Sequence, residues 1–150
     1  MPVRFHNDDV RFMLRNKRLY QSFLEEQFFR ITGKMLDIQV VFCSDSRLLD
    51  INRQFLKHDY YTDIITFPLH EGEDRVMAEL YISLDRVDDH AQEFGVSRVH
   101  ELNRVIFHGV LHLCGLKDKT ERQQKEMRQA EEEWLKVWAN ELRSHSLSRR

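Results

Sequence analysis

The sequence predicts an α+β fold in which a small mixed four-stranded sheet packs with about five helices. Three observations lead to this prediction. Four short segments are rich in β-branched and aromatic residues, five longer segments carry apolar residues at helical spacing, and capping residues stand at the ends of those helices. The 150 residues suit a single domain over positions 1–150, and 41% of them are hydrophobic, which is enough to build a core.

The predicted strands are short, as expected for a small sheet. They lie at residues 3–6, 37–42, 63–67 and 77–83. We expect Pro68 to end the third strand, because proline has no N–H to donate to a sheet ladder.

The predicted helices follow from apolar spacing of three and four residues. They span residues 16–32, 44 or 45 to about 56, 85–94, 97–113, and a last segment that begins at 120 and contains both tryptophans. Gly33, Gly95 and Gly115 stand just past three of these helices, where glycine is favoured. Residues 143–150 are polar, basic and terminal, so we expect a flexible tail there.

Composition narrows the class of protein. The formal net charge of -2 gives no general argument for a nucleic-acid partner, which would need a local basic patch. Cys43 and Cys114 form no CxxC pair and fit a reducing compartment. No apolar run approaches the roughly 20 residues of a membrane span, and the N-terminus lacks the apolar core of a signal peptide. We therefore expect a cytoplasmic protein without a membrane partner.

The segment that carries chemistry is residues 107–118, Phe-His-Gly-Val-Leu-His-Leu-Cys-Gly-Leu-Lys-Asp. His108 and His112 are four apart on a predicted helix, so their imidazoles lie on one face and can reach one metal ion. Gly115 then breaks the helix and allows the chain to present Asp118. Two imidazoles and a carboxylate suit one zinc ion or another divalent transition metal, and three protein ligands leave a position open for water.

Neighbouring residues leave alternatives open. Two histidines at this spacing also occur by chance as core or surface residues. Cys114 points away from the pair on a helix and is better explained as a small core residue than as a fourth ligand. Glu101 and Arg104 project along the stripe of His108, where they either orient the histidines or form a solvated charged surface. Gly109 occupies the position of the general base of His-Glu-x-x-His proteases, which argues against that mechanism.

The motif resembles the signature of the YbeY family of bacterial endoribonucleases, H-G-x-L-H-L-x-G-x-D-H. The resemblance extends to Thr-Asp-Ile-Ile-Thr-Phe-Pro at 62–68, to Glu-Leu-Tyr-Ile-Ser at 79–83 and to the opening Phe-His-Asn at 5–7. It covers most of residues 3–138. It implies a metal-dependent endoribonuclease specific for single strands, acting on the 3′ end of small-subunit ribosomal RNA and in ribosome quality control. It also implies contacts with the small ribosomal subunit, its proteins and a GTPase.

Two departures from the family pattern concern the chemistry. The family's third zinc-binding histidine falls on Asp118, which is a competent ligand that favours harder ions. Many members carry an arginine, implied to serve the RNA reaction, where this chain has Leu56. Lys57 and His58 are adjacent, so they are the candidate catalytic residues, and an imidazole can act as a general acid or base near neutral pH.

Contacts to RNA would require clustered basic residues. Lys117, Arg15 and Arg18 are the candidates for RNA binding, the last two within a basic group at positions 11–18. A second basic group contains Arg143 and the two C-terminal arginines, for which solubility is the simpler explanation.

Two other functions remain open on the sequence. The chain could be a ribosome-assembly factor that binds RNA and holds a structural metal, or a metal-dependent hydrolase of another substrate such as a peptide or small ester. An exchangeable water on the ion would argue against the first, and Gly109 weakens the peptide version of the second.

Overall fold

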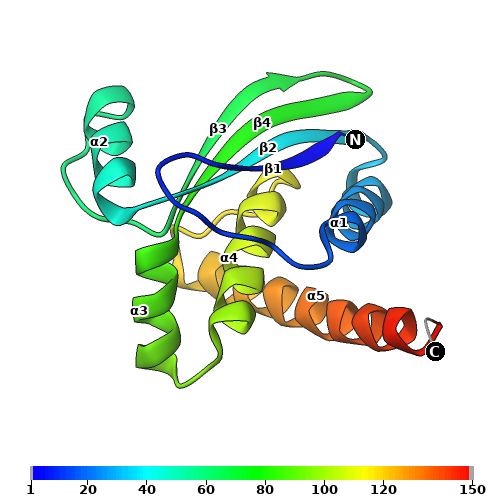
Figure 1. Ribbon diagram of the computed structural model, residues 1–150. Coiled ribbons are helices and arrows are strands. Elements are labelled where there is room, and N and C mark those ends of the chain that lie inside the picture. Colours follow the sequence, from blue (N-terminus) through cyan, green and yellow to red (C-terminus); the bar gives the residue numbers. More distant parts are fainter. Residues whose placement is uncertain (1, 149–150) are drawn as a thin grey trace.

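The computed structural model describes residues 2–148 (Figure 1). Its strands are β1 (Val3–Asn7), β2 (Met35–Cys43), β3 (Ile64–Glu71) and β4 (Arg75–Ser83). Its helices are α1 (Lys17–Thr32), α2 (Asp45–Phe55), α3 (Leu84–Phe94), α4 (Arg98–Leu113) and α5 (Glu121–Ser148). The predicted fold class, an α+β fold with a four-stranded mixed sheet and five helices, is confirmed. Within residues 2–148 no helix combines the length and apolarity needed to cross a bilayer.

The sheet has the strand order β1-β2-β4-β3. β1 and β4 both run parallel to β2, whereas β3 pairs with β4 as an antiparallel hairpin and forms one edge. Inward-facing residues of β2 and β4 are buried at alternate positions, as a half-covered sheet requires. Figure 1 shows α1, α4 and α5 on one face of the sheet. α2 packs on the other face, where Phe55 contacts Phe67 of β3.

The prediction that Pro68 ends the third strand was wrong. β3 continues through Pro68 to Glu71, with a register shift between Pro68 and His70. Proline is tolerated there because β3 is an edge strand and a bulge leaves a residue without a ladder partner.

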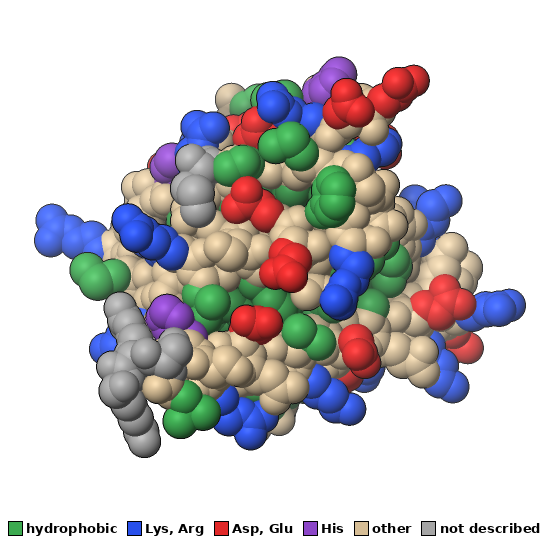
Figure 2. Space-filling model, turned by 90° about the vertical axis from the view of Figure 1, so that its right-hand side faces the viewer, with side chains coloured by type: hydrophobic (Ala, Val, Ile, Leu, Met, Phe, Trp, Pro, Cys, Tyr) green, Lys and Arg blue, Asp and Glu red, His purple; other side chains and the backbone are tan. Residues whose placement is uncertain are grey.

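The prediction of a flexible tail over residues 143–150 was also wrong for the part that the structure describes. α5 continues as helix to Ser148, and residues 149–150 lie outside the described residues. The basic residues beyond Trp138 extend a long helix whose earlier turns are anchored in the core. Figure 2 shows the face at the right of Figure 1, with acidic and basic side chains interspersed rather than gathered into one basic patch.

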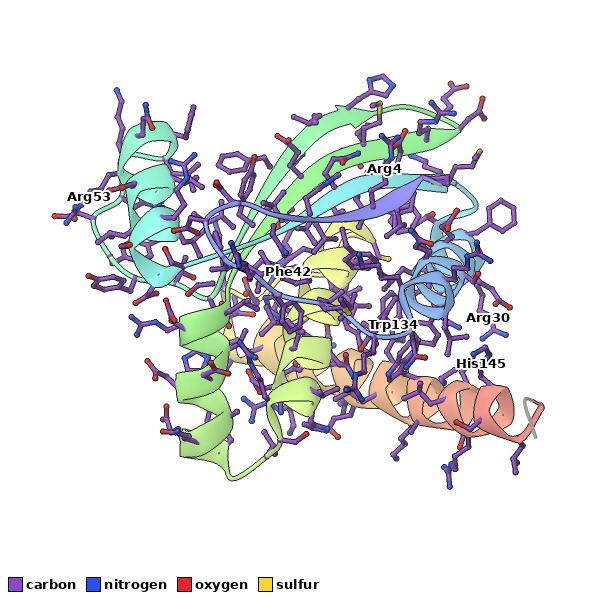
Figure 3. All side chains as sticks on the ribbon, in the orientation of Figure 1. Arg4, Arg30, Phe42, Arg53, Trp134 and His145 are labelled. Carbon is purple, nitrogen blue, oxygen red and sulfur yellow. The ribbon has the colours of Figure 1, made fainter. Side chains whose placement is uncertain are left out.

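An aromatic cluster joins the three helices under the sheet. Phe23 of α1 contacts Phe107 of α4 and the tryptophans Trp134 and Trp138 of α5, at centroid distances of 5.2 to 6.0 Å. Figure 3 shows Trp134 pointing from α5 toward the space between α1 and α4. These contacts fix α5 against α4, the helix that carries the histidine pair.

α4 approaches the sheet closely at Gly109. A Cβ atom at this position would lie 2.7 Å from side-chain methyl groups of both Ile64 in β3 and Leu80 in β4. The missing side chain therefore allows the helix to rest on the two strands, with His108 and His112 held near the start of β3.

Replacing Gly109 with leucine is expected to lower the free energy of unfolding by about 1–3 kcal/mol or more, because the added side chain overpacks the helix–sheet contact. Chemical denaturation monitored by circular dichroism measures this loss. Val99→Leu is the matched control, since Val99 lies on the same helix and is 60% exposed. Equal stability of the two variants would show that the close approach is not a packing constraint.

Candidate metal centre

The three predicted metal ligands converge in the structure. Nε2 of His108 lies 3.3 Å and Nε2 of His112 lies 3.2 Å from the same oxygen, Oδ2 of Asp118. The two imidazole rings are 4.6 Å apart between centroids and nearly perpendicular, at 86°. All three side chains are half-buried, so they can be reached from solvent.

The turn that ends α4 brings Asp118 to the histidines. Gly115 has φ 106°, a conformation that side chains rarely adopt, and its N–H donates to the carbonyl of His112. The chain then folds back, so that the loop between α4 and α5 reaches the edge where β3 begins (Figure 1). The predicted role of Gly115 as the helix-ending residue is confirmed.

The Nδ1 atom of each imidazole faces an acceptor. His108 Nδ1 lies 2.7 Å from Oε2 of Glu131, and His112 Nδ1 lies 2.9 Å from the carbonyl oxygen of Leu116. An acceptor at Nδ1 places the proton of a neutral imidazole on that nitrogen and leaves the Nε2 lone pair free. Both free lone pairs then point toward Asp118.

This geometry fits a divalent ion. Two ligand atoms about 2.1 Å from a tetrahedral zinc ion lie about 3.4 Å apart, close to the separations between the Nε2 atoms and the Asp118 oxygen. Without a cation, two nitrogen lone pairs and a carboxylate oxygen would face one another and repel, unless both imidazoles were protonated. The donor set of two imidazoles and one carboxylate is one that zinc and related ions accept.

The local charges favour a cation at His108. Burial alone lowers the pKa of His108, but its hydrogen bond to Glu131 and the negative charges of Glu131, Asp118 and Asp63 outweigh that effect. The pKa of His108 therefore lies above its usual value. The same arrangement that stabilises an imidazolium stabilises a bound metal ion.

A row of largely buried polar side chains holds His108 on the side away from Asp118. Glu131 is 5% exposed and accepts a hydrogen bond of 3.1 Å from Arg104 Nη1 on Oε1. Arg104 Nε in turn lies 3.3 Å from Glu101, which is 2% exposed. The pKa of Glu101 lies above its usual value, because the effect of burial exceeds the opposing effect of Arg104 and His90. The alternative of a solvated charged stripe is therefore wrong for Glu101. Arg104 acts on His108 through Glu131.

Asp63, His90 and Glu101 form a second group beside the first. His90 Nδ1 lies 3.6 Å from Asp63 and 3.9 Å from Glu101. The backbone carbonyl of Asp63 is fixed by the N–H of Ser83, at 2.9 Å. Because Glu101 is already balanced by Arg104, this group adds negative charge beside the metal ligands and does not require an ion of its own.

The metal ligands stand where two clefts meet. One cleft, of about 390 Å³, lies between α3, α4 and α5 and contains both Arg104 and Arg128. The other, of about 440 Å³, follows the start of β3 from Thr62 to Pro68. Asp63, His108 and Asp118 line both clefts. The arrangement suits an extended chain lying across the site.

Of the other predicted site residues, only Lys117 lies next to this centre, as the chain neighbour of Asp118. Lys57 is exposed in the loop before β3, with φ 56°, and His58 stacks on Tyr60 in the same loop. Neither residue lines the two clefts. Lys117 is exposed beside Asp118, whereas Arg15 is exposed in the turn before α1 and Arg18 in its first turn. The catalytic and RNA-binding roles of these residues stay predictions.

Cys114 packs against the core at the end of α4. Burial raises the pKa of its thiol to about 12. An unionised thiol is a poor metal ligand, so the interpretation of Cys114 as a core residue agrees with its environment.

Sequence reasoning missed Glu131, which orients His108. The signal was present in α5, where Met127, Glu131, Trp134 and Trp138 recur at helical spacing and are all buried. A carboxylate within an apolar stripe requires a buried partner. Asp63, His90 and Arg128 were also missed, and they carry no comparable signal because only the fold places them at the clefts.

Fold and site together define a small α+β protein in which one helix and the turn after it bring two imidazoles and a carboxylate together, as a metal-dependent enzyme requires. The comparisons with known proteins identify the family. Residues 3–139 match the family model described as Endoribonuclease YbeY.

Curated relatives have the same name. Endoribonuclease YbeY of Bacteroides thetaiotaomicron is 40% identical over 135 residues, which are 90% of this chain and 98% of the relative. That of Phocaeicola vulgatus is 50% identical over 99 residues, covering 66% of this chain and 71% of the relative. A Thermotoga maritima protein solved in solution has a TM-score of 0.60 and 26% identity, over 95% of this chain and 93% of that one. The chain therefore belongs to the YbeY family of endoribonucleases, and the predicted resemblance is confirmed.

Glu131→Gln is expected to weaken zinc binding about 10- to 100-fold, because the amide no longer holds the His108 proton with a full negative charge. Competition with a chromophoric chelator measures the affinity. Glu132→Gln is the matched control, since Glu132 is exposed on the same helix. Unchanged affinity of Glu131→Gln would contradict the orienting role.

Cys43 and Cys114 are expected to resist alkylation by iodoacetamide at pH 8 in the folded protein. Burial raises the pKa of both thiols to about 12, which reduces the thiolate fraction on the order of a thousandfold relative to an ordinary cysteine. Mass spectrometry of native and denatured samples measures the protection. If a chelator alone exposed Cys114 to alkylation, the residue would be a metal ligand after all.

Proposed function

We propose that this endoribonuclease cleaves single-stranded RNA with one divalent ion held by His108, His112 and Asp118. We further propose that the ion is zinc, that the substrate is ribosomal RNA near the 3′ end of the small-subunit RNA, and that the enzyme works in the cytoplasm beside the small subunit and its proteins. A role in ribosome quality control belongs to the same proposal.

One observation carries the proposal. Two imidazole nitrogens lie 3.2 and 3.3 Å from one carboxylate oxygen at the meeting point of two open clefts. A structural metal site is usually closed by four protein ligands, whereas three ligands facing a cleft leave a position for water or substrate. An open site favours catalysis over a purely structural ion.

The charge of one cleft favours a cation beside a bound phosphate. Four carboxylates line the cleft between α3, α4 and α5, against two guanidinium groups. A phosphodiester that approached these carboxylates without a counterion would be repelled. A bound divalent ion reverses the sign of the field at the point where the phosphate must lie.

The donor set bears on the metal. Two imidazoles and one carboxylate are a common set for catalytic zinc, and zinc accepts the distances of 3.2 and 3.3 Å between the Nε2 atoms and the Asp118 oxygen. The carboxylate in place of a third imidazole shifts preference toward harder ions, so manganese is the comparison to make.

The protein groups divide the work around the phosphate. His108, His112 and Asp118 would hold a divalent ion, which when bound would stabilise the charge that develops on the phosphoryl oxygens. Arg128 lines the cleft and is exposed, so it can contact a phosphate directly. Arg104 is held by Glu131 and Glu101 and keeps the ligand framework rigid. Lys117 stands beside Asp118, where it can neutralise a neighbouring phosphate.

His112→Ala is expected to lose most bound metal and to reduce cleavage of single-stranded RNA at least a hundredfold, whereas Asp118→His should keep both. The physical reason is that the first change removes a ligand and the second replaces one competent ligand with another. Elemental analysis and cleavage of a labelled oligoribonucleotide, with and without chelator, measure the two effects.

His100→Ala is the matched control, because His100 lies in the first turn of the same helix and outside both clefts. Metal-loaded protein that binds ribosomal subunits but leaves RNA intact would favour an assembly factor instead. Hydrolysis of a peptide or small ester with RNA left uncut would favour another substrate.

A further inference from the structure

We propose that Tyr60 and Tyr61 form a stacking platform for unpaired nucleobases beside the cleavage site. This inference rests on the proposed function, because it assigns to the same site the means by which it distinguishes single strands. The two tyrosines are neighbours in the chain and do not belong to the core. Their side chains are 56% and 53% exposed.

The platform directly precedes, along the chain, residues that line the cleft along the start of β3. Tyr60 and Tyr61 lie in the loop between α2 and β3, and the next two residues, Thr62 and Asp63, line that cleft. Two residues of extended chain span at most about 7 Å, so Tyr61 lies close to Asp63. For an RNA strand whose phosphate occupies the metal centre, we place the neighbouring bases on these rings.

Hydrogen bonds to α2 hold the loop between α2 and β3 in place. Asn52 is 1% exposed at the end of α2, and its side-chain amide donates to the carbonyl of Tyr60 at 2.8 Å. The carbonyl of Asn52 accepts from the N–H of His58 at 3.1 Å. Arg53, which points outward from α2 in Figure 3, forms an ion pair with Asp59 of the loop. The backbone that carries the rings is thus positioned before any ligand binds.

Each ring is supported by a polar or charged neighbour. The Tyr60 ring stacks on the imidazole of His58 at 5.2 Å, and its hydroxyl lies 3.0 Å from His58 Nδ1. The guanidinium of Arg86 lies 4.9 Å from the centre of the Tyr61 ring and is itself held by Asp45 at 2.7 Å. The imidazole of His58 thus supports the Tyr60 ring.

Exposed aromatic rings are surfaces on which proteins stack single-stranded bases, and arginine guanidinium groups add to such binding. The faces of bases in a duplex are occupied by their neighbours, whereas unpaired bases can lie on a protein ring. The platform thus explains a preference for single strands at a site whose metal ligands can contact only the backbone. Neither tyrosine belongs to a core cluster, so folding does not account for their exposure.

The test measures binding separately from cleavage. The probe is a short single-stranded RNA with one 2-aminopurine, whose fluorescence falls when the base stacks, and it is bound in the presence of zinc. Tyr61→Ala and Tyr60→Ala are each expected to weaken binding roughly 5- to 150-fold and to relieve the quenching. Tyr60→Phe and Tyr61→Phe are expected to bind as the wild type does, because the stacking face is retained.

Phe29→Ala is the matched control, since Phe29 is an aromatic residue of α1 that is 59% exposed and lies outside both clefts. A double variant, Tyr60→Ala with Tyr61→Ala, should lose most of the preference for the single strand over the same strand annealed to its complement. Thermal melting checks that the variants are folded.

Binding and quenching by folded alanine variants that equal the wild type would overturn the platform. A rise in KM with kcat nearly unchanged would support it, because the rings bind bases and do not touch the reacting atoms. If the wild type bound RNA with quenching but did not cleave it, the proposed function would fail while the platform stood.

Discussion

The hydrogen bond between His108 and the buried carboxylate of Glu131 is the interaction on which the site depends. It joins α4 to α5 at 2.7 Å and holds the His108 ring so that Nε2 faces Asp118. A carboxylate that is 5% exposed is costly to bury unless it is paired, and Glu131 is paired twice, with His108 and with Arg104. The contact between His108 and Glu131 thus does two things. It gives the buried carboxylate a partner, and it orients the imidazole.

α4 serves the core and the site at once. One side of this helix carries Phe107 into the aromatic cluster with Trp134, and the other carries the two histidines toward solvent. Gly109 lies between the histidines in sequence and permits the helix to rest on β3 and β4. The position of the metal ligands therefore depends on how tightly the core packs.

The chemistry of the surroundings divides into two parts. The cleft between α3, α4 and α5 is lined by carboxylates and arginines, which suit a cation-dependent reaction on a phosphodiester. At the edge of the sheet, the loop before β3 offers aromatic rings, which suit bases. RNA presents both kinds of group along one chain, and a strand lying from the loop to the metal centre would meet each in turn.

Local patterns determined much of this protein. Helical spacing, glycines just past helix ends and the pair His108 and His112 are short-range features. The sequence alone therefore predicted the helices, the fold class and the three side chains that converge. Pro68 misled the prediction, because edge position and a bulge are properties of the assembled sheet.

Tertiary structure alone decided which distant residues serve the site. Glu131 follows His108 by more than twenty positions, and Asp63 precedes it by more than forty, so no periodicity connects them. Only packing of α5 on α4, and of α4 on β3, places their carboxylates beside the histidines. Spacing along one helix sets which ligands point together, whereas the groups that orient them come from elements brought near by the core.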